Sequence, residues 1–210
     1  MSEYNPPWEE IIRLHQNLKY IVLKAEELTK EKETYIQPIL EQRDALDHFI
    51  RSKAAELGLL EKTKDSYYIE QQFEKMKGHL YRAFFDAADW ASTSIRDEVD
   101  FVLSRYTHEC IVAVIPEYYE EIIPSIDNIS NKIALIRNGK DIAQEKNEIV
   151  EEVNRYFDLV DGLFTHLSKI KSKIRGLEDY RKRSLIEKWK NWIITLIIGV
   201  ICIILGWLIN

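Results

Sequence analysis

The chain has 210 residues, of which only 7 are glycine and 5 are proline while 30% are charged, a composition typical of long helices in one domain with or without an appendage. These counts exclude collagen-like, low-complexity and turn-rich β-sheet proteins, and two cysteines are too few for a disulfide framework. Residues 1–180 (the body) hold 24 of the 29 basic and 34 of the 35 acidic side chains, so the body is a poor general partner for a nucleic-acid phosphate backbone.

Two helices are predicted near the N-terminus. Asn5 followed by two prolines is typical of a helix start, because Asn caps the first turn and proline is tolerated there. A second helix is predicted from about Tyr35 to Leu57, ending at Gly58. The expected core faces are Trp8, Ile11, Ile12, Leu18, Ile21, Val22, Ala25 and Leu28 in the first helix, and Ile36, Ile39, Leu40, Leu46, Ile50, Ala54 and Leu57 in the second.

Two further helices are predicted between residues 65 and 116. The third begins at Asp65 or Ser66, and its apolar residues keep a 4-3 heptad spacing, which indicates knobs-into-holes packing. Ser94 with Asp97 resembles a capping box and predicts the start of a fourth helix, which ends before Pro116. The heptad positions of the third helix are Ile69, Phe73, Met76, Leu80, Ala83, Ala87 and Trp90.

A short fifth helix and one long helix follow. The fifth is interrupted by Pro124 and closes at Asn138 and Gly139, where a left-handed residue ends a helix easily. No proline occurs from Asp141 onward, and we expect one long helix that continues through a basic segment at residues 181–190. Its apolar stripe is Ile149, Val153, Phe157, Val160, Phe164, Leu167, Ile170, Ile174 and Leu177.

Residues 192–209 contain no charged side chain. At 1.5 Å per residue a helix of this length spans about 27 Å, close to the roughly 30 Å hydrocarbon core of a bilayer. Trp192 and Trp207 lie near its two ends, where indoles prefer the membrane interface, and the basic segment precedes it. The positive-inside rule then predicts a single-pass protein with a C-terminal tail anchor, residues 1–190 in the cytoplasm and the C-terminus on the far side.

Small residues recur along one stripe of this apolar helix. Thr195, Gly199, Cys202 and Gly206 follow one another at spacings of four, three and four, a pattern that lets helix backbones approach closely in lipid. Glycine is also frequent in membrane helices in general. The stripe therefore indicates either contact between anchors, which predicts a homo-oligomer in the bilayer, or composition alone.

The second predicted helix carries a charged seam position, Arg43. A charge there needs a partner or solvent, and Asp47 one turn on can supply the partner, as can Asp86 or Asp89 of the third helix. The third helix adds a polar stripe, which would form a pocket inside the bundle with Arg43 and His48, or else a solvated face. The members of this stripe are His79, Arg82, Asp86 and Asp89.

The spacing of Arg43 and His48, R-x4-H on a helix of an all-helical protein, resembles the HEPN family over about residues 8–115. The resemblance implies a helical, often dimeric endoribonuclease of toxin and antiviral systems with RNA as substrate. Arg43 would then stabilise phosphate charge, and His48 would transfer a proton or orient the 2′-hydroxyl. Asp44 stands where the family often has Asn or another polar residue. The alternative is structural: an Arg43–Asp47 ion pair beside a solvated histidine.

The sequence carries no other motif for chemistry. It has no Gly-rich phosphate loop, no G-x-S-x-G, no H-E-x-x-H and no paired C-x-x-C, and none of its five histidines follows a Glu by three residues as in di-iron bundles. We therefore expect neither a cofactor nor a resident metal.

These observations predict an all-α protein. Its parts are a cytoplasmic antiparallel helical bundle over residues 1–140, a long heptad-patterned helix with a basic juxtamembrane segment over 141–190, and a transmembrane anchor over 191–210. The favoured function is a regulatory or interaction module that self-associates at a lipid bilayer and binds a protein partner through the bundle. The alternatives are a membrane-attached HEPN-like endoribonuclease and a pore-forming effector of bacterial or archaeal antiviral defence.

Overall fold

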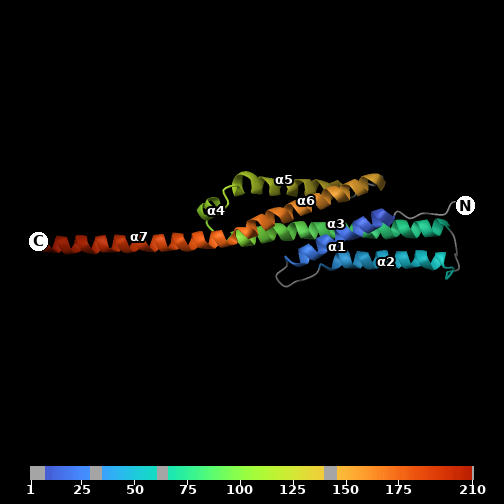
Figure 1. Ribbon diagram of the computed structural model, residues 1–210, viewed down its shortest axis with the longest axis horizontal. Coiled ribbons are helices and arrows are strands. Elements are labelled where there is room, and N and C mark those ends of the chain that lie inside the picture. The colour runs from blue at the N-terminus through green and yellow to red at the C-terminus, as the bar shows by residue number, and fades with distance from the viewer. Residues whose placement is uncertain (1–7, 29–34, 61–65, 140–145, 210) are drawn as a thin grey trace.

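The computed structural model describes the chain except for residues 1–7, 29–34, 61–65, 140–145 and 210. The described part is all-α, as predicted, and contains no strand (Figure 1). The predicted helix start at Asn5 lies outside the described residues. The elements are α1 (Trp8–Glu26), α2 (Ile36–Glu56), α3 (Ser66–Leu103), α4 (His108–Val114), a π-helix (Tyr118–Ile122), α5 (Ile123–Gly139), α6 (Lys146–Ser172) and α7 (Ile174–Ile209).

α3 is the central helix of the bundle. Figure 1 shows it between α2 on one side and α6 on the other, and α1 also packs against it. It presents small or apolar residues in several directions, so that three helices can bury their faces on it. Its predicted heptad residues are buried or half-buried, which confirms that seam. The additional fully buried positions are Phe84, Ala88, Ala91 and Ile95.

The predicted helix start at Ser94 is wrong, because α3 runs without a break to Leu103. Ser92 and Thr93 both donate their hydroxyls to the carbonyl of Asp89 in the preceding turn, at 2.9 and 3.1 Å. Hydroxyls that bond back to the helix in this way do not cap a new one. The next helix, α4, starts later, where the Thr107 side chain accepts a bond from the Cys110 N–H.

The predicted core face of α2 is also wrong. The helix ends as expected before Gly58, whose φ of 76° is the left-handed conformation that glycine adopts easily. Its buried residues, however, are Pro38, Ala45, Ser52 and Ala55. Large apolar residues of the predicted face, including Ile39, Leu46 and Ile50, are exposed. Small side chains let α2 approach α3 closely, and this close contact outweighs burial of the larger residues.

Pro124 does not interrupt a helix. It lies in the first turn of α5, where its missing N–H costs nothing, and the π-helix directly precedes α5. The predicted end of α5 at Gly139 is confirmed.

The predicted single long helix is divided at Lys173 into α6 and α7. The Lys173 N–H bonds to the carbonyl of Ile170, three residues back, which tightens the chain at this point. Close by, a Cβ on Gly176 would lie 3.0 Å from Val114, so α7 passes very near α4. Leu177 is the last fully buried side chain, and α7 then extends away from the bundle (Figure 1).

Candidate functional site

Two histidines meet where α2 packs on α3. The rings of His48 and His79 are stacked, with centroids 5.2 Å apart and an interplanar angle of 24°. His48 Nδ1 lies 2.8 Å from Gln72 Oε1. His79 Nδ1 lies 2.8 Å from Glu41 Oε2, and that oxygen also accepts from Arg82 Nε at 2.9 Å. We call these five residues the histidine cluster.

The histidine cluster contains a contact whose direction depends on the tautomer of His79. Nδ1 of His79 lies 2.8 Å from Glu41 Oε2 and 2.7 Å from Arg82 Nη2. When it carries a proton it donates to Glu41, and when it does not it accepts from Arg82. Burial alone would raise the pKa of Glu41, but the hydrogen bonds from His79 and Arg82 prevail and hold that pKa below its usual value.

Three of the residues proposed from the sequence, His48, His79 and Arg82, therefore lie together. Glu41 and Gln72 were missed. Glu41 precedes His48 by seven residues, two helical turns on one face, and this spacing would have pointed to it.

The side chain of Arg43 bonds to Asp44 and not to a residue of the histidine cluster. It is exposed, and its guanidinium donates to Asp44 at 2.7 and 2.9 Å. This contact holds the pKa of Asp44 below its usual value. Asp47 pairs instead with Arg51 at 2.8 Å, so the predicted Arg43–Asp47 ion pair is wrong. Asp44, the next residue in the chain, is close enough to bond the Arg43 guanidinium, so Arg43 does not need a partner one helical turn away.

Asp89 does not extend the cluster in the way the polar stripe suggested. Asp86 is half-buried one turn beyond Arg82, which pairs with Glu41 of α2. Asp89 faces α6, where its carboxylate accepts a hydrogen bond from the Tyr156 hydroxyl.

Among the described residues, the bond from Tyr156 belongs to a set that joins tyrosine hydroxyls to carboxylates across the helices. Each bond ties together segments that are far apart in the chain. Burial, followed by the adjacent carboxylate, raises the pKa of Tyr20, Tyr81 and Tyr106 above 10. The pairs are Tyr20–Asp161, Tyr81–Glu10, Tyr106–Glu178 and Tyr156–Asp89.

We expect the free energy of unfolding to fall above pH 10 because of these tyrosines. Below pH 10 the hydroxyl is protonated in both states, and its stabilising bond is fully present. As the pH rises further, the unfolded chain releases its protons first, because the folded-state pKa is raised, and stability is lost. Urea unfolding between pH 8 and 11.5 should show a steeper decline for the wild-type protein than for Tyr81→Phe. The exposed Tyr67→Phe is the control, and an equal decline in all three proteins would contradict the prediction.

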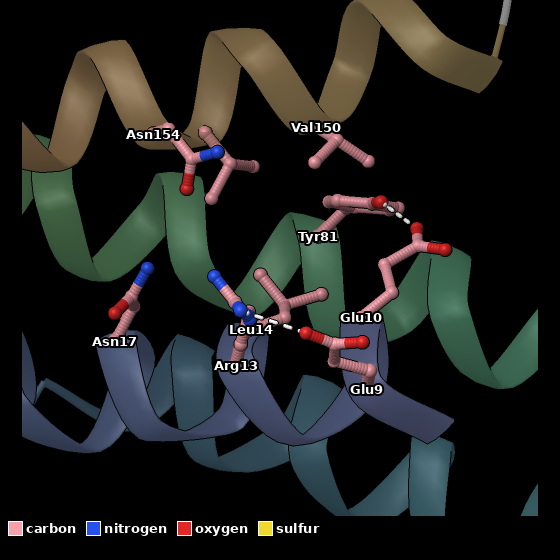
Figure 2. A pocket seen from close by; sticks show the side chains of 9 residues that line it. Glu9, Glu10, Arg13, Leu14, Asn17, Tyr81, Val150 and Asn154 are labelled. Carbon is pink, nitrogen blue, oxygen red and sulfur yellow. Dashed lines mark hydrogen bonds and ion pairs between the residues drawn. The ribbon is translucent and has the colours of Figure 1, made fainter. Parts of the chain in front are cut away.

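A pocket of about 590 Å³ opens between α1, α3 and α6 (Figure 2). At its floor Glu10 accepts from the Tyr81 hydroxyl and pairs with the buried Lys77 at 3.0 Å. An exposed Glu9–Arg13 ion pair of 2.7 Å lies on its rim. The volume falls in the range of small-molecule sites, about 300–1,000 Å³. Because the floor charges already neutralise each other, the pocket offers hydrogen bonds and apolar walls rather than a net charge.

The described residues hold no group of three or more His, Cys, Asp or Glu side chains arranged to bind a metal ion. In the histidine cluster, Nδ1 of His48 contacts Gln72, and Nδ1 of His79 contacts Glu41 and Arg82.

α7 is the described helix that is long and apolar enough to cross a membrane. Every described side chain from 185 to 207 is exposed, including Trp192 and Trp207. The Thr195 hydroxyl donates to the Asn191 carbonyl of the same helix at 2.9 Å. A Cβ on Gly199 would meet nothing within 4 Å. Cys202 is exposed on the same helix, and the surroundings of Gly206 lie outside the described part.

Comparisons with protein-family models, with curated proteins and with solved structures gave no match to this chain, so its function is argued from these sites alone.

Proposed function

We propose that this chain is a single-pass membrane protein whose antiparallel helical bundle is a cytoplasmic interaction module that self-associates. The observation that carries the proposal is the contrast between α7 and the bundle. The bundle buries large residues such as Phe73, Phe84 and Tyr156 completely, whereas α7 leaves its uncharged side chains at 192–205 and 207 exposed. Soluble monomers rarely expose an apolar patch larger than a few hundred Å², and lipid removes the cost of this one.

The charges beside the apolar run support the orientation. Arg181, Lys182, Arg183, Lys188 and Lys190 are all exposed where α7 leaves the bundle. Basic residues next to a membrane helix stay on the cytoplasmic side and are attracted to anionic lipid headgroups. The T-shaped pair of Trp189 and Trp192, with centroids 5.9 Å apart, marks the level of the interface.

Self-association has support within the anchor. The open space at Gly199 lies on the stripe of Thr195, Cys202 and Gly206, and this side of α7 would let a second anchor approach closely.

Truncation after Arg183 tests the proposal. We expect the full-length chain in the membrane fraction, resistant to extraction by high salt, and the truncated chain in the soluble fraction with unchanged helicity. The cut preserves the last contacts of α7 with the bundle: the buried Leu177, the Tyr106–Glu178 bond of 2.8 Å and the Arg181 guanidinium 5.6 Å from the centre of the Tyr106 ring. Recovery of the full-length protein in the soluble fraction without detergent would contradict the anchor.

RNA cleavage is a second candidate, supported by the histidine cluster. The imidazoles of His48 and His79 are groups suited to proton transfer near neutral pH, and the Arg82 guanidinium can stabilise phosphate charge. The three side chains come from α2 and α3, which pack together. Arg43 belongs to the family resemblance but would have to leave Asp44 to join them. Pore formation has less support, because the Thr195 hydroxyl is already bonded within α7.

Comparing His48→Ala with Arg43→Ala distinguishes catalysis from structure. If the bundle is a ribonuclease, His48→Ala should reduce RNA cleavage at least a hundredfold while the protein stays folded. If it is an interaction module, no cleavage is present to lose, and His48→Ala lowers the melting temperature slightly through the lost contacts with Gln72 and His79. Arg43→Ala should leave the melting temperature unchanged, because the Arg43–Asp44 pair is exposed. Full cleavage by a folded His48→Ala protein would exclude the HEPN-like mechanism.

A further inference from the structure

α2 turns its large apolar side chains away from the bundle. The helix packs on α3 through Pro38, Ala45, Ser52 and Ala55. A surface helix normally buries its large apolar residues, so their exposure here needs an explanation. The outward residues are 45–73% exposed: Ile36, Ile39, Leu46, Ile50 and Leu57.

The exposed residues have the spacing of a coiled-coil seam. They occupy a and d positions over three heptads, and Arg43 and Lys53 fill the two remaining positions. We call this row of seven positions the α2 seam. An apolar groove of about 630 Å³ adjoins it, with Ile39 and Leu46 on one wall and Trp8 of α1 on the other. A second helix could therefore pack against the seam and fill the groove beside it.

The direction of α2 excludes the lipid surface as the occupant. Figure 1 shows α2 lying along the long axis that α7 extends. When α7 crosses a bilayer, α2 stands roughly along the membrane normal, and a helix in that position does not lay its apolar face on the headgroups. The occupant is a protein helix.

We propose that the α2 seam pairs with the α2 seam of a second copy of this chain in the same membrane. The proposal rests on the membrane anchorage proposed above. Copies held by α7 share one orientation, so their α2 helices run parallel. Each seam residue then meets its own counterpart across a two-fold axis along the membrane normal, which makes the interface self-complementary.

The charge of α2 permits two copies to pair through this face. The body holds 34 acidic and 24 basic side chains, so two copies repel each other over much of their surface. α2 holds four acidic and three basic side chains, which nearly balance. The charges beside the seam are also paired: Arg43 with Asp44 at 2.7 Å, and Arg51 with Asp47 at 2.8 Å. The two seams can therefore meet without the repulsion that the acidic body as a whole would impose.

Arg43 sets the register of the pair. In the matched register both Arg43 side chains share one layer, each neutralised by its own Asp44. A shift of one heptad would press Arg43 against Ile36 or Ile50 of the other copy, and a polar a-position residue excludes such shifts at some cost in stability.

The pairing is weak outside the membrane. The exposed seam offers on the order of 500 Å² of apolar surface per copy, compared with about 800 Å² per partner in a standard interface. Anchoring supplies the difference, because confinement in one bilayer raises the effective concentration of the second copy.

Cysteine cross-linking in vesicles tests the pairing. The test uses the full-length chain with the substitution Cys202→Ala. The remaining native cysteine, Cys110, is buried. After reconstitution into phosphatidylcholine vesicles, mild oxidation should cross-link two copies through Leu46→Cys. The control Arg51→Cys, equally exposed on α2 but off the seam, should cross-link at least tenfold less. Equal yields at the two positions, or none at Leu46→Cys, would overturn the proposal.

A second set of variants tests the same seam by disruption. Ile39→Asp with Ile50→Asp should abolish cross-linking at Leu46→Cys, whereas Leu135→Asp, on an exposed leucine of α5, should not. Melting of the monomer in detergent should be unchanged by the double substitution. A large loss of melting temperature would show that the seam packs within its own chain and would overturn the proposal.

Vesicle flotation separates this proposal from the anchorage on which it rests. A chain that floats with vesicles but does not cross-link overturns the pairing and leaves the anchorage intact. A chain that does not float overturns both. Cross-linking of the seam to a different protein in native membranes, with none between copies in vesicles, also overturns the pairing and assigns the seam to that protein.

Discussion

Replacing Ile198 and Ile201 by arginine should release the full-length protein from membranes and leave its bundle folded. Both side chains are exposed near the middle of the apolar run and touch nothing in the bundle. An arginine at the centre of a membrane helix costs about 2.5–3.5 kcal/mol, so the pair costs roughly 5–7 kcal/mol. At about 1.4 kcal/mol per factor of ten, this shifts insertion by more than a thousandfold. Membrane fractionation with circular dichroism of the released protein measures both parts of the result.

The matched control replaces the same two residues by leucine, which lipid tolerates as well as isoleucine. This variant should stay in the membrane fraction. If the arginine variant also stays there, the protein is held to membranes by something other than insertion of α7, such as its basic segment. High salt would then remove it, because such binding is electrostatic and is screened.

Phe84→Ala should destabilise the bundle more than any exposed substitution. The side chain is fully buried in α3, with its ring 5.6 Å from that of Phe85 and 6.3 Å from that of Tyr156 on α6. Truncating a buried phenylalanine to alanine costs about 3–5 kcal/mol through lost transfer energy and the cavity left behind. This is a large part of the 5–15 kcal/mol of a typical domain. Urea denaturation of the protein truncated after Arg183 measures the change.

Leu135→Ala is the control for the core substitution. Leu135 lies on α5 and is 72% exposed, so its truncation should change the free energy of unfolding by about 0.5 kcal/mol or less. A loss below about 1 kcal/mol for Phe84→Ala would mean that α3 and α6 do not pack as described, since no well-packed core accepts such a cavity at that cost.

Much of the helical organisation could be predicted because it depends on neighbours in the chain. Gly58 ended α2 as expected, since its conformational freedom acts locally, and α5 likewise ends at Gly139. The run from Trp192 and the basic residues before it identified α7 without any knowledge of the bundle, because a length and a composition are enough to recognise a helix that can span a bilayer. The stripe that ends at Leu177 likewise followed from helical periodicity.

The histidine cluster could be predicted only in part. His79 and Arg82 lie on one face of one helix, so their spacing placed them together. Their contact with His48 and Glu41 depends on how α2 is rotated and aligned against α3. The partner of Arg43 could not be predicted from spacing either. The spacing allowed an ion pair with Asp47, but the Arg43 side chain pairs with Asp44.

By itself, the sequence determined that the protein is helical, where α2 and α5 end, and which helix is apolar enough for lipid. The tertiary structure decided which face of α2 is buried. Periodicity reveals that a helix has an apolar stripe, but close approach to α3 required the small residues Ala45, Ser52 and Ala55, and the stripe was left outside. The tertiary structure also decided which distant residues bond, such as Tyr20 with Asp161. The packing of whole helices sets the distance between such residues, and no rule about neighbours in the chain predicts it.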